Sequence, residues 1–454
     1  MKKLSAVLLP FMGFLYLSAY IRSATLDVVY TDYIRIAVTY LYHPFSPALY
    51  FRRDALTRLP ITYFERVVNI LLFGYSTTFD MMLGIGFLAL MGLLLGIYMV
   101  KKNLSLPTMV LVMLLVFSLS QWEMITNGTG WVHFFAFFMF LVHFYVYDSY
   151  VRRPTRGKKI LNFLLPVVTI LSAAGSYSLA YGAALLVVYG IFYKKGKKEN
   201  LWFAIPVVLS VGLFLCSYAC SDKFNAGATT ESIFTVLARD PLYFPQFGLN
   251  SLASDVMGVG LVEEYGIPHI WLLLTGAVVF VFYILALYVN LRHKLYEKSL
   301  LPFILVLSGV FSHGLILLTR WIFLNPLYAM SSRYALQFGA GLIGVCLTFA
   351  LYQSLHEERK TQSRLLKPWV SLFFLFVLAG NLATAANEIR MAKYRMEDFE
   401  KRREIALTFR EQDNATLIQR LQYYDHYKIR EALTLLRDNE WNIFRPQKSQ
   451  PGEE

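Results

Sequence analysis

Long apolar runs without a charged side chain recur along this chain of 454 residues. Each run has about 18 or more residues, and a helix of that length crosses a hydrocarbon core roughly 30 Å thick. Hydrophobic side chains make up 56% of the sequence, which is far more than the core of a soluble protein needs. The sequence therefore predicts an all-α polytopic membrane protein.

The apolar runs predict about eleven transmembrane helices, and basic clusters between them indicate which side of the membrane each connection faces. The predicted spans are 4 to 22, 78 to 100, 104 to 120, 131 to 149, 160 to 176, 178 to 193, 202 to 219, 269 to 291, 300 to 319, 334 to 354 and 369 to 387. Lysine and arginine cluster after each even-numbered span, at 101 to 102, 152 to 159, 194 to 198, 292 to 298 and 357 to 364. Because basic connections stay in the cytoplasm, we expect a multi-pass protein of the cell membrane with a cytoplasmic N-terminus and an extracytoplasmic C-terminus.

These spans divide the chain into two expected units. Residues 1 to 387 are the transmembrane domain, with a large first extracytoplasmic loop at 24 to 76 that contains juxtamembrane helices, and a second large outer loop at 221 to 268. Residues 388 to 454 are charged and have apolar side chains at helical spacing. They predict a small helical tail on the extracytoplasmic side.

Charge and cysteine content exclude several classes of function. The net charge of +13 does not indicate a nucleic-acid partner, because the basic residues lie in short clusters that set orientation in the membrane. The three cysteines give neither a disulfide framework nor a metal-binding spacing, and there is no Gly-rich phosphate loop or nucleophile elbow. We expect no metal site and no cofactor, while the need for a divalent metal stays open.

The first loop carries arginine but no lysine. Its arginines are Arg35, Arg52, Arg53, Arg58 and Arg66. A guanidinium can hold a phosphate through two hydrogen bonds, which predicts a phosphate-bearing ligand with Arg52, Arg53 and Arg58 as its contacts. The alternative is that these side chains reach lipid headgroups or pair with Asp54 and Glu65.

Two acids, Asp27 and Asp32, follow the first predicted span by a few residues. A carboxylate at the membrane face can accept the proton of a sugar hydroxyl while that oxygen attacks an activated anomeric carbon. Asp32 also begins a stretch whose spacing suits a juxtamembrane helix, so Thr31 or Asp32 can equally be a helix cap. Both interpretations stay open, and either acid is a candidate catalytic base.

Two further outer segments carry candidate contacts for a sugar and a phosphate. In the turn QWEMITNGTGW, Trp122 can stack on a sugar ring and Glu123 can bind its hydroxyls, although an interfacial tryptophan and an exposed acid explain them as well. Arg333 and Tyr334 begin a late span, where the arginine is either an interface anchor or a charge directed at a site.

Inside the predicted spans, Asp80 and His313 are polar groups at a depth where burial is costly. Either side chain can be explained by hydrogen bonds within the packed bundle. The sequence therefore predicts no function for them.

Taken together, these segments resemble a GT-C type glycosyltransferase, the integral membrane class that uses polyprenyl-phosphate sugars, and in particular a group of bacterial envelope proteins. The resemblance spans nearly the whole chain and is carried by Asp32 in TDYIRI, RRDALTRLP from Arg52, Gln121 to Glu123, SSRYAL around Arg333, and NIF at Asn442. The chain departs from the family pattern at Met124, where the pattern has asparagine, and around Asp54 and Thr57, where it has histidine.

The resemblance implies an inverting hexosyl transfer from a polyprenyl-phosphate-linked sugar to an envelope glycan, a teichoic-type polymer or a glycoprotein. The loop acid, Asp32 or Asp27, would be the base. The donor phosphate would lie on Arg52, Arg53, Arg58 and Arg333, with Trp122, Glu123 and Tyr334 against a sugar. The rival hypotheses are a flippase or transporter of lipid-linked sugars and a scaffold subunit; a transporter should carry charges through the middle of the bundle, and the spans are nearly free of them.

Overall fold

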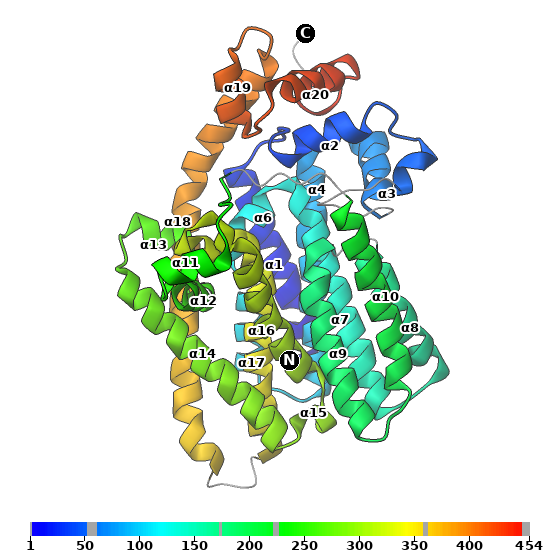
Figure 1. Cartoon of the computed structure of the whole chain (residues 1–454), viewed down its shortest axis with the longest axis vertical. Helices are drawn as coiled ribbons and strands as arrows, with labels where there is room; N and C mark the ends of the chain where they lie inside the picture. The colour runs from blue at the N-terminus through cyan, green and yellow to red at the C-terminus, as the bar shows by residue number, and fades with distance from the viewer. Residues whose placement is uncertain (1, 52–60, 172–174, 221–226, 357–361, 447–454) are drawn as a thin grey trace.

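The computed structural model of the chain is all-helical over the residues it describes, which are 2–51, 61–171, 175–220, 227–356 and 362–446. In that part of the chain there is no strand, and ten helices are long and apolar enough to cross a membrane. They form one bundle, with a smaller group of helices over one of its ends (Figure 1). The prediction of an all-α polytopic membrane protein is thereby confirmed.

The long helices of the bundle follow the apolar runs of the sequence. They are α1 (Lys2–Ala24), α4 (Thr77–Lys101), α5 (Leu106–Val116), α7 (Trp131–Arg152), α8 (Arg156–Thr169), α9 (Ser178–Lys194), α10 (Asn200–Ala219), α14 (His269–Arg292), α16 (Leu301–Arg320), α17 (Ala335–His356) and α18 (Gln362–Leu407). Large apolar side chains on their outer faces are exposed, including Phe11, Leu209 and Trp369. Such a surface suits a lipid environment and not water.

The sequence predicts eleven spans, whereas ten helices within the described residues have the length and hydropathy to cross a membrane. The difference is α8, the counterpart of the predicted span 160 to 176, whose described helix has 14 residues. A helix of that length rises about 21 Å, which is shorter than a hydrocarbon core of roughly 30 Å. The α8–α9 hairpin nevertheless returns to the end where it began, because Lys197 Nζ donates a hydrogen bond to the Val151 carbonyl at 3.1 Å.

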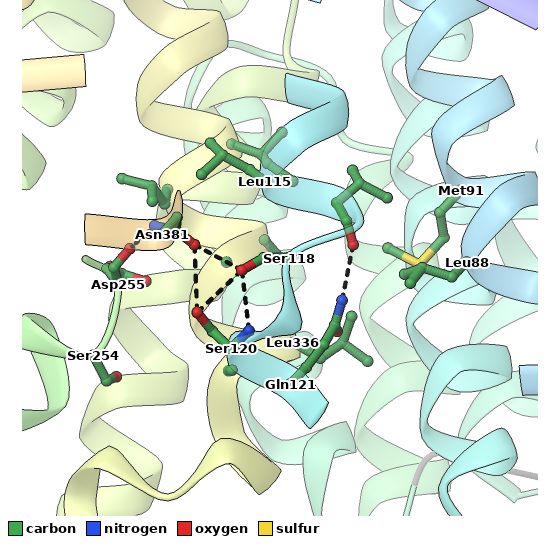
Figure 2. A pocket seen from close by; sticks show the side chains of 16 residues that line it. Leu88, Met91, Leu115, Ser118, Ser120, Gln121, Ser254, Asp255, Leu336 and Asn381 are labelled. Atoms are coloured by element: carbon green, nitrogen blue, oxygen red, sulfur yellow. Dashed lines mark hydrogen bonds between the residues drawn. The ribbon is translucent and has the colours of Figure 1, made fainter. Parts of the chain in front are cut away.

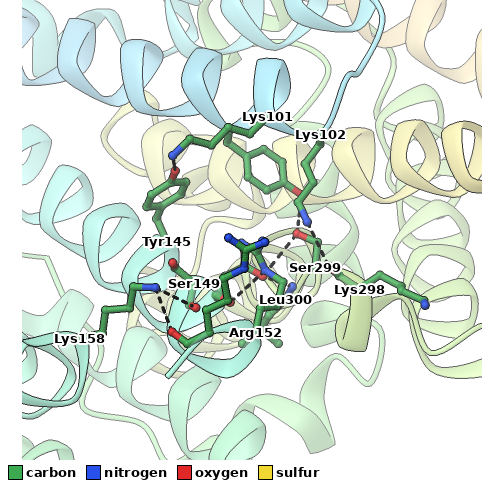
Figure 3. A network of polar contacts seen from close by, with 12 residues as sticks. Lys101, Lys102, Tyr145, Ser149, Arg152, Lys158, Lys298, Ser299 and Leu300 are labelled. Atoms are coloured by element: carbon green, nitrogen blue, oxygen red, sulfur yellow. Dashed lines mark hydrogen bonds and ion pairs between the residues drawn. The ribbon is translucent and has the colours of Figure 1, made fainter. Parts of the chain in front are cut away.

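Four of the basic connections, at 101 to 102, 152 to 159, 194 to 198 and 292 to 298, meet at one end of the bundle, and Figure 3 shows residues of three of them. Lys102 Nζ donates to the Lys298 carbonyl at 3.0 Å, and Lys101 Nζ donates to the Tyr145 hydroxyl at 2.6 Å. Lys2 Nζ donates to Asn103 at 2.9 Å, which places the N-terminus at the same end. The connections therefore share one side, as the alternation of spans predicts. The membrane face to which this side corresponds stays a prediction.

Short helices fill the connections at both ends. They are α2 (Asp32–Tyr40), α3 (Ile61–Val68), α6 (Trp122–Thr126), α11 (Ile233–Arg239), α12 (Tyr243–Ala253), α13 (Val259–Glu264), α15 (Leu295–Lys298), α19 (Asn414–Leu421) and α20 (His426–Asp438). The 3-10 turns are η1 (Pro47–Phe51), η3 (Leu119–Gln121), η4 (Gly128–Gly130), η6 (Gly175–Tyr177), η7 (Trp321–Phe323), η8 (Pro326–Met330), η9 (Ser332–Tyr334) and η10 (Asn442–Phe444), and η2 (Asn69–Phe73) is a π-helix.

The second outer loop enters the bundle. Helix α12 packs against α14 so closely that a Cβ on Gly276 would lie 2.0 Å from the Leu249 carbonyl oxygen. Just after α12, the Asp255 carbonyl accepts a hydrogen bond from Asn381 Nδ2 of α18 at 3.0 Å. This loop is therefore part of the packed interior as well as of the outer surface.

Helix α18 joins the bundle to the tail without a break. Its 46 residues correspond to a length of about 69 Å, and the expected domain boundary at 387/388 falls inside it. Beyond it, α19 and α20 pack on the first loop through one apolar cluster that includes Val29, Ile34, Leu421 and Leu433. We call α19, α20 and η10 the cap. Figure 1 shows the cap over α2, at the end of the molecule away from α15.

We predict that Gly276→Ala destabilises the protein, because the added carbon would overlap the Leu249 carbonyl of α12. The expected loss is about 1–3 kcal/mol, measured as a lower midpoint of thermal unfolding in detergent. Gly212→Ala in α10 is the control, since nothing lies within 4 Å of its Cβ position. Equal midpoints for the two variants would show that α12 and α14 do not pack this closely.

A second prediction concerns the sides of the membrane. In a protein whose three native cysteines are replaced, Tyr427→Cys on the cap should react with an impermeant maleimide in intact cells. Lys198→Cys at the basic end should react only after the cells are permeabilised. Both positions are exposed, so accessibility reports sidedness. The reverse labelling would place the N-terminus outside.

Candidate functional site

Two of the residues predicted for the site, Glu123 and Arg333, form an ion pair at the end opposite the lysines. Arg333 Nε donates to Glu123 Oε1 at 2.5 Å, and Ser332 Oγ donates to Glu123 Oε2 at 3.1 Å. The negative charge of Asp32 also acts on the Arg333 guanidinium. Helix α4 begins at Thr77 on this side and ends at Lys101, about 37 Å away along its axis.

The position of Asp32 depends on the cap. Asp32 is the first residue of α2, and the preceding Thr31 has φ 51 and ψ −127, a conformation that costs energy for a residue other than glycine. The Thr31 N–H donates to the Leu421 carbonyl of α19 at 2.9 Å, which holds this conformation. Thr31 occupies the N-cap position, but its side chain makes no capping hydrogen bond. Asp32 is half-buried.

Asp27, the other candidate base, is occupied by hydrogen bonds. Its carboxylate accepts from Ser76 Oγ at 2.7 Å, from the Thr77 N–H at 2.7 Å and from Thr77 Oγ1 at 2.8 Å. A further bond comes from Asn442 Nδ2 at 2.7 Å. Asp27 therefore joins the first loop, the start of α4 and the C-terminal turn. A carboxylate held in this way has little capacity left to accept a substrate proton.

A second arginine, which the sequence analysis did not select, lies near Arg333. The charges of Arg320 and Arg333 both act on Tyr177. Arg320 Nε is buried and has no hydrogen-bond partner. The position of Arg320 at the outer end of α16 is the only signal in the sequence that could have identified it. Because Glu123 already pairs with Arg333, Arg320 adds a second guanidinium at this end of the bundle.

The remaining predicted contacts are placed differently. Trp122 lies under the Arg395 guanidinium, whose Cζ is 3.3 Å from the ring centroid. Tyr334 is 5% exposed and packs with Tyr328 and Phe338 in an apolar cluster. Both aromatic rings are thus engaged by the protein itself. Arg52, Arg53 and Arg58 lie outside the described residues.

A pocket lies close to Glu123 and Arg333 along the chain, and Figure 2 shows side chains that line it. Gln121 lines it two residues before Glu123, and Ala335 lines it two residues after Arg333. Polar residues occupy part of its wall, namely Ser118, Ser120, Gln121, Ser254, Asp255 and Asn381. In Figure 2, Ser118, Ser120 and Asn381 point toward one another and are joined by hydrogen bonds.

Asp255 was not selected from the sequence, because it lies in a segment that we expected to be a surface loop. In the structure it is 6% exposed. Tyr283 donates to Asp255 Oδ2 at 3.2 Å, and His313 Nε2 lies 3.6 Å from the same oxygen. His313 Nδ1 is 3.0 Å from Ser251 Oγ. His313, which the sequence identified only as a costly polar group, is therefore a partner of a buried acid.

A second buried polar group lies under α2 and α3. Asp80 accepts hydrogen bonds from Tyr33 at 2.6 Å and from Asn69 Nδ2 at 2.6 Å. Glu65 and Arg66 line the same small pocket. Burial, followed by the negative charge of Asp80, raises the pKa of the Glu65 carboxyl well above its usual range. Glu65 therefore keeps its proton to a higher pH than an exposed glutamate does.

No group of three or more His, Cys, Asp or Glu side chains within the described ranges is placed to hold a metal ion. Compared with protein-family models, with curated proteins and with solved structures, the chain matches none of them. The function must therefore be argued from the site itself.

We predict that Glu65→Gln stabilises the protein more at pH 8 than at pH 5. A carboxyl whose folded-state pKa is raised contributes stability below its unfolded pKa and loses it as the pH rises toward the folded value, by up to about 1.4 kcal/mol per pH unit. The amide cannot lose a proton, so the variant escapes this loss. The measurement is the midpoint of thermal unfolding at both pH values.

The control for this prediction is Glu411→Gln, which makes the same chemical change at an exposed position between α18 and α19. It should change the midpoint equally little at both pH values. If Glu65→Gln gains no more stability over the wild type at pH 8 than at pH 5, the pKa of Glu65 is not raised in the folded protein.

Proposed function

We propose that this protein is a membrane glycosyltransferase of the inverting GT-C type. It would move a hexosyl group from a polyprenyl-phosphate donor to an envelope glycan, a teichoic-type polymer or a glycoprotein on the extracytoplasmic side. The observation that supports this proposal best is the ion pair of Arg333 with Glu123 at the end of the bundle opposite the basic connections, where the negative charge of Asp32 also acts on Arg333. A transferase needs a carboxylate and a guanidinium that converge in this way.

In this mechanism Asp32 accepts the proton of the acceptor hydroxyl as the oxygen attacks the anomeric carbon. The bond from that carbon to the lipid phosphate breaks, and its electron pair leaves with the phosphate oxygen. Arg333 stabilises the negative charge that develops there. Its Nε is held by Glu123 and its side chain stays 50% exposed, so it remains accessible to an anionic ligand. Arg320 adds a second positive charge.

Glu123 is more useful as a partner of Arg333 than as a sugar contact. Both of its carboxylate oxygens are engaged, one by Arg333 and one by Ser332. An arginine whose orientation is fixed before the substrate arrives loses less entropy when it binds a phosphate. The assignment of Asp32, and not Asp27, as the base follows from the four hydrogen bonds that Asp27 accepts.

Transport of lipid-linked sugars is the second candidate function. The observation in its favour is the buried pair of Asp255 and His313, since ionisable groups inside a bundle often mark a transport path. His313 lies about 18 Å along α16 from Leu301 at the basic end, which places the pair in the outer half of the bundle. The pair is thus closer to the proposed site than to the opposite face. Its position fits a substrate pocket better than a transport path through the bundle.

The test is complementation of cells that lack this protein, with the sugar composition and linkage of the envelope glycan as the measurement. Asp32→Asn should reach the membrane at the wild-type level and lower the rate of incorporation of one sugar by about 10²–10⁴-fold, because the catalytic base is lost. Asp438→Asn, at an exposed position of the cap, is the control with the same chemical change.

If Asp32→Asn restores the glycan in full, Asp32 is not the base. A transporter predicts a further difference, because cells that lack the protein would then accumulate the lipid-linked sugar on the cytoplasmic face and not on the outer face.

A further inference from the structure

We infer that the pocket close to Glu123 and Arg333 along the chain is a binding site for sugar hydroxyl groups, with Asp255 and Gln121 as their acceptors. This inference deepens the proposed function and rests on it for the source of the sugar. Of its polar wall, only Gln121 belongs to a segment in which the sequence analysis named candidate ligand contacts.

Two buried acceptor atoms in this pocket have no partner. They are Asp255 Oδ1 and Gln121 Oε1. Their residues are 6% and 3% exposed, so bulk water does not satisfy them. Burying an unpaired polar atom is costly, and a native structure that keeps two of them in one pocket indicates an occupant that donates hydrogen bonds. Sugar hydroxyls are such donors.

The two acceptors are held in place by bonds to their other atoms. Gln121 Nε2 donates to the Val116 carbonyl at 2.8 Å, as the dashed line in Figure 2 shows, which leaves Oε1 as the atom without a bond. Asp255 Oδ2 is engaged by Tyr283 and lies near His313, which leaves Oδ1. Neither side chain needs to rotate before it binds a ligand.

The rest of the wall suits a sugar ring. Ser118 and Ser120 carry hydroxyls that can donate or accept, and they are already connected to Asn381. Leu88 and Met91 provide apolar surface across the pocket from these polar groups, and Leu336 lies beside Ser120. A sugar ring has polar edges and apolar faces, so a wall of both kinds is the expected complement.

The pocket has a cavity volume of about 40 Å³, which is room for a few hydroxyl groups, and Gly339 of α17 borders it. This residue lines the pocket, and nothing lies within 4 Å of the position where its Cβ would be. Gly339 follows Ala335, the first residue of α17, by four positions, or about 6 Å. A side chain added here would therefore fill the pocket from the wall.

The experiment uses the full-length protein, purified in nanodiscs with the total lipid of the cells that produce it. The carbohydrate that stays bound is released by acid and quantified as monosaccharides. Solvent extraction before hydrolysis separates the two sources, because a lipid-linked donor enters the organic phase and an acceptor glycan stays in the aqueous phase. Wild-type protein and Asp32→Asn, which should bind without turnover, are both measured.

In both backgrounds Gly339→Val should lower the bound carbohydrate at least tenfold, because its three added carbons occupy the pocket. Gly314→Val in α16 is the matched control: it is also half-buried, nothing lies within 4 Å of its Cβ, and it does not line the pocket. Asp255→Asn should also reduce the bound carbohydrate, since an amide replaces one acceptor oxygen of the carboxyl group by an NH₂ donor.

Equal carbohydrate on the Gly339→Val and Gly314→Val proteins overturns the inference, and so does the absence of carbohydrate from both wild type and Asp32→Asn. These outcomes are independent of the proposed function, which is tested by transfer. If Asp32→Asn restores the glycan while Gly339→Val loses the bound sugar, the pocket is a sugar site and Asp32 is not the base. If Asp32→Asn abolishes transfer while the pocket variants bind as much carbohydrate as the wild type, the proposed function is supported and the inference about the pocket is wrong.

Discussion

The hydrogen bonds to Asp27 are the constraint on which the outer half of this molecule depends. They connect three segments that the sequence separates widely, since Asp27 and Asn442 are 415 positions apart. Asn442 also donates to the Tyr75 carbonyl at 3.1 Å, and its own N–H donates to the Gly74 carbonyl at 2.9 Å. The loop, the start of α4 and the C-terminal turn are therefore fixed as one unit, which then holds the strained Thr31 that precedes Asp32.

The sequence predicts the bundle well, because the bilayer imposes a simple pattern on it. Helices that cross a hydrocarbon core must satisfy their own backbone and present apolar side chains, so length and hydropathy are sufficient to find them. The alternation of spans also predicts that the basic connections lie at one end of the bundle. The count changes from eleven to ten at α8, where Arg156, Lys158 and Lys159 occupy the first turn and shorten the apolar part.

The sequence predicts the candidate site less completely. Glu123 and Arg333 were selected and form an ion pair on which the charge of Asp32 acts, whereas Asp255 and Arg320 were not selected. Asp255 belongs to a loop whose polar residues suggest contact with water, and only the packing of α12 on α14 shows that the loop enters the bundle. Burial of an acid is a property of tertiary structure and leaves no local pattern. For the same reason the sequence gives no sign that Glu65 is buried beside Asp80.

Helix α3 and the π-helix η2 bear on how a lipid-linked substrate would approach such a site. Their polar side chains Glu65, Arg66 and Asn69 are buried, whereas Phe64 is 62% and Leu72 is 69% exposed. This polarity is the reverse of that of a helix facing water, and it is typical of a segment that lies against lipid. Its inner face meets Tyr33 and Asp80 below α2, the helix that Asp32 begins. The first loop thus presents an apolar surface to the membrane and a polar surface to the interior, which is the arrangement that a substrate with a polyprenyl tail and a charged head requires.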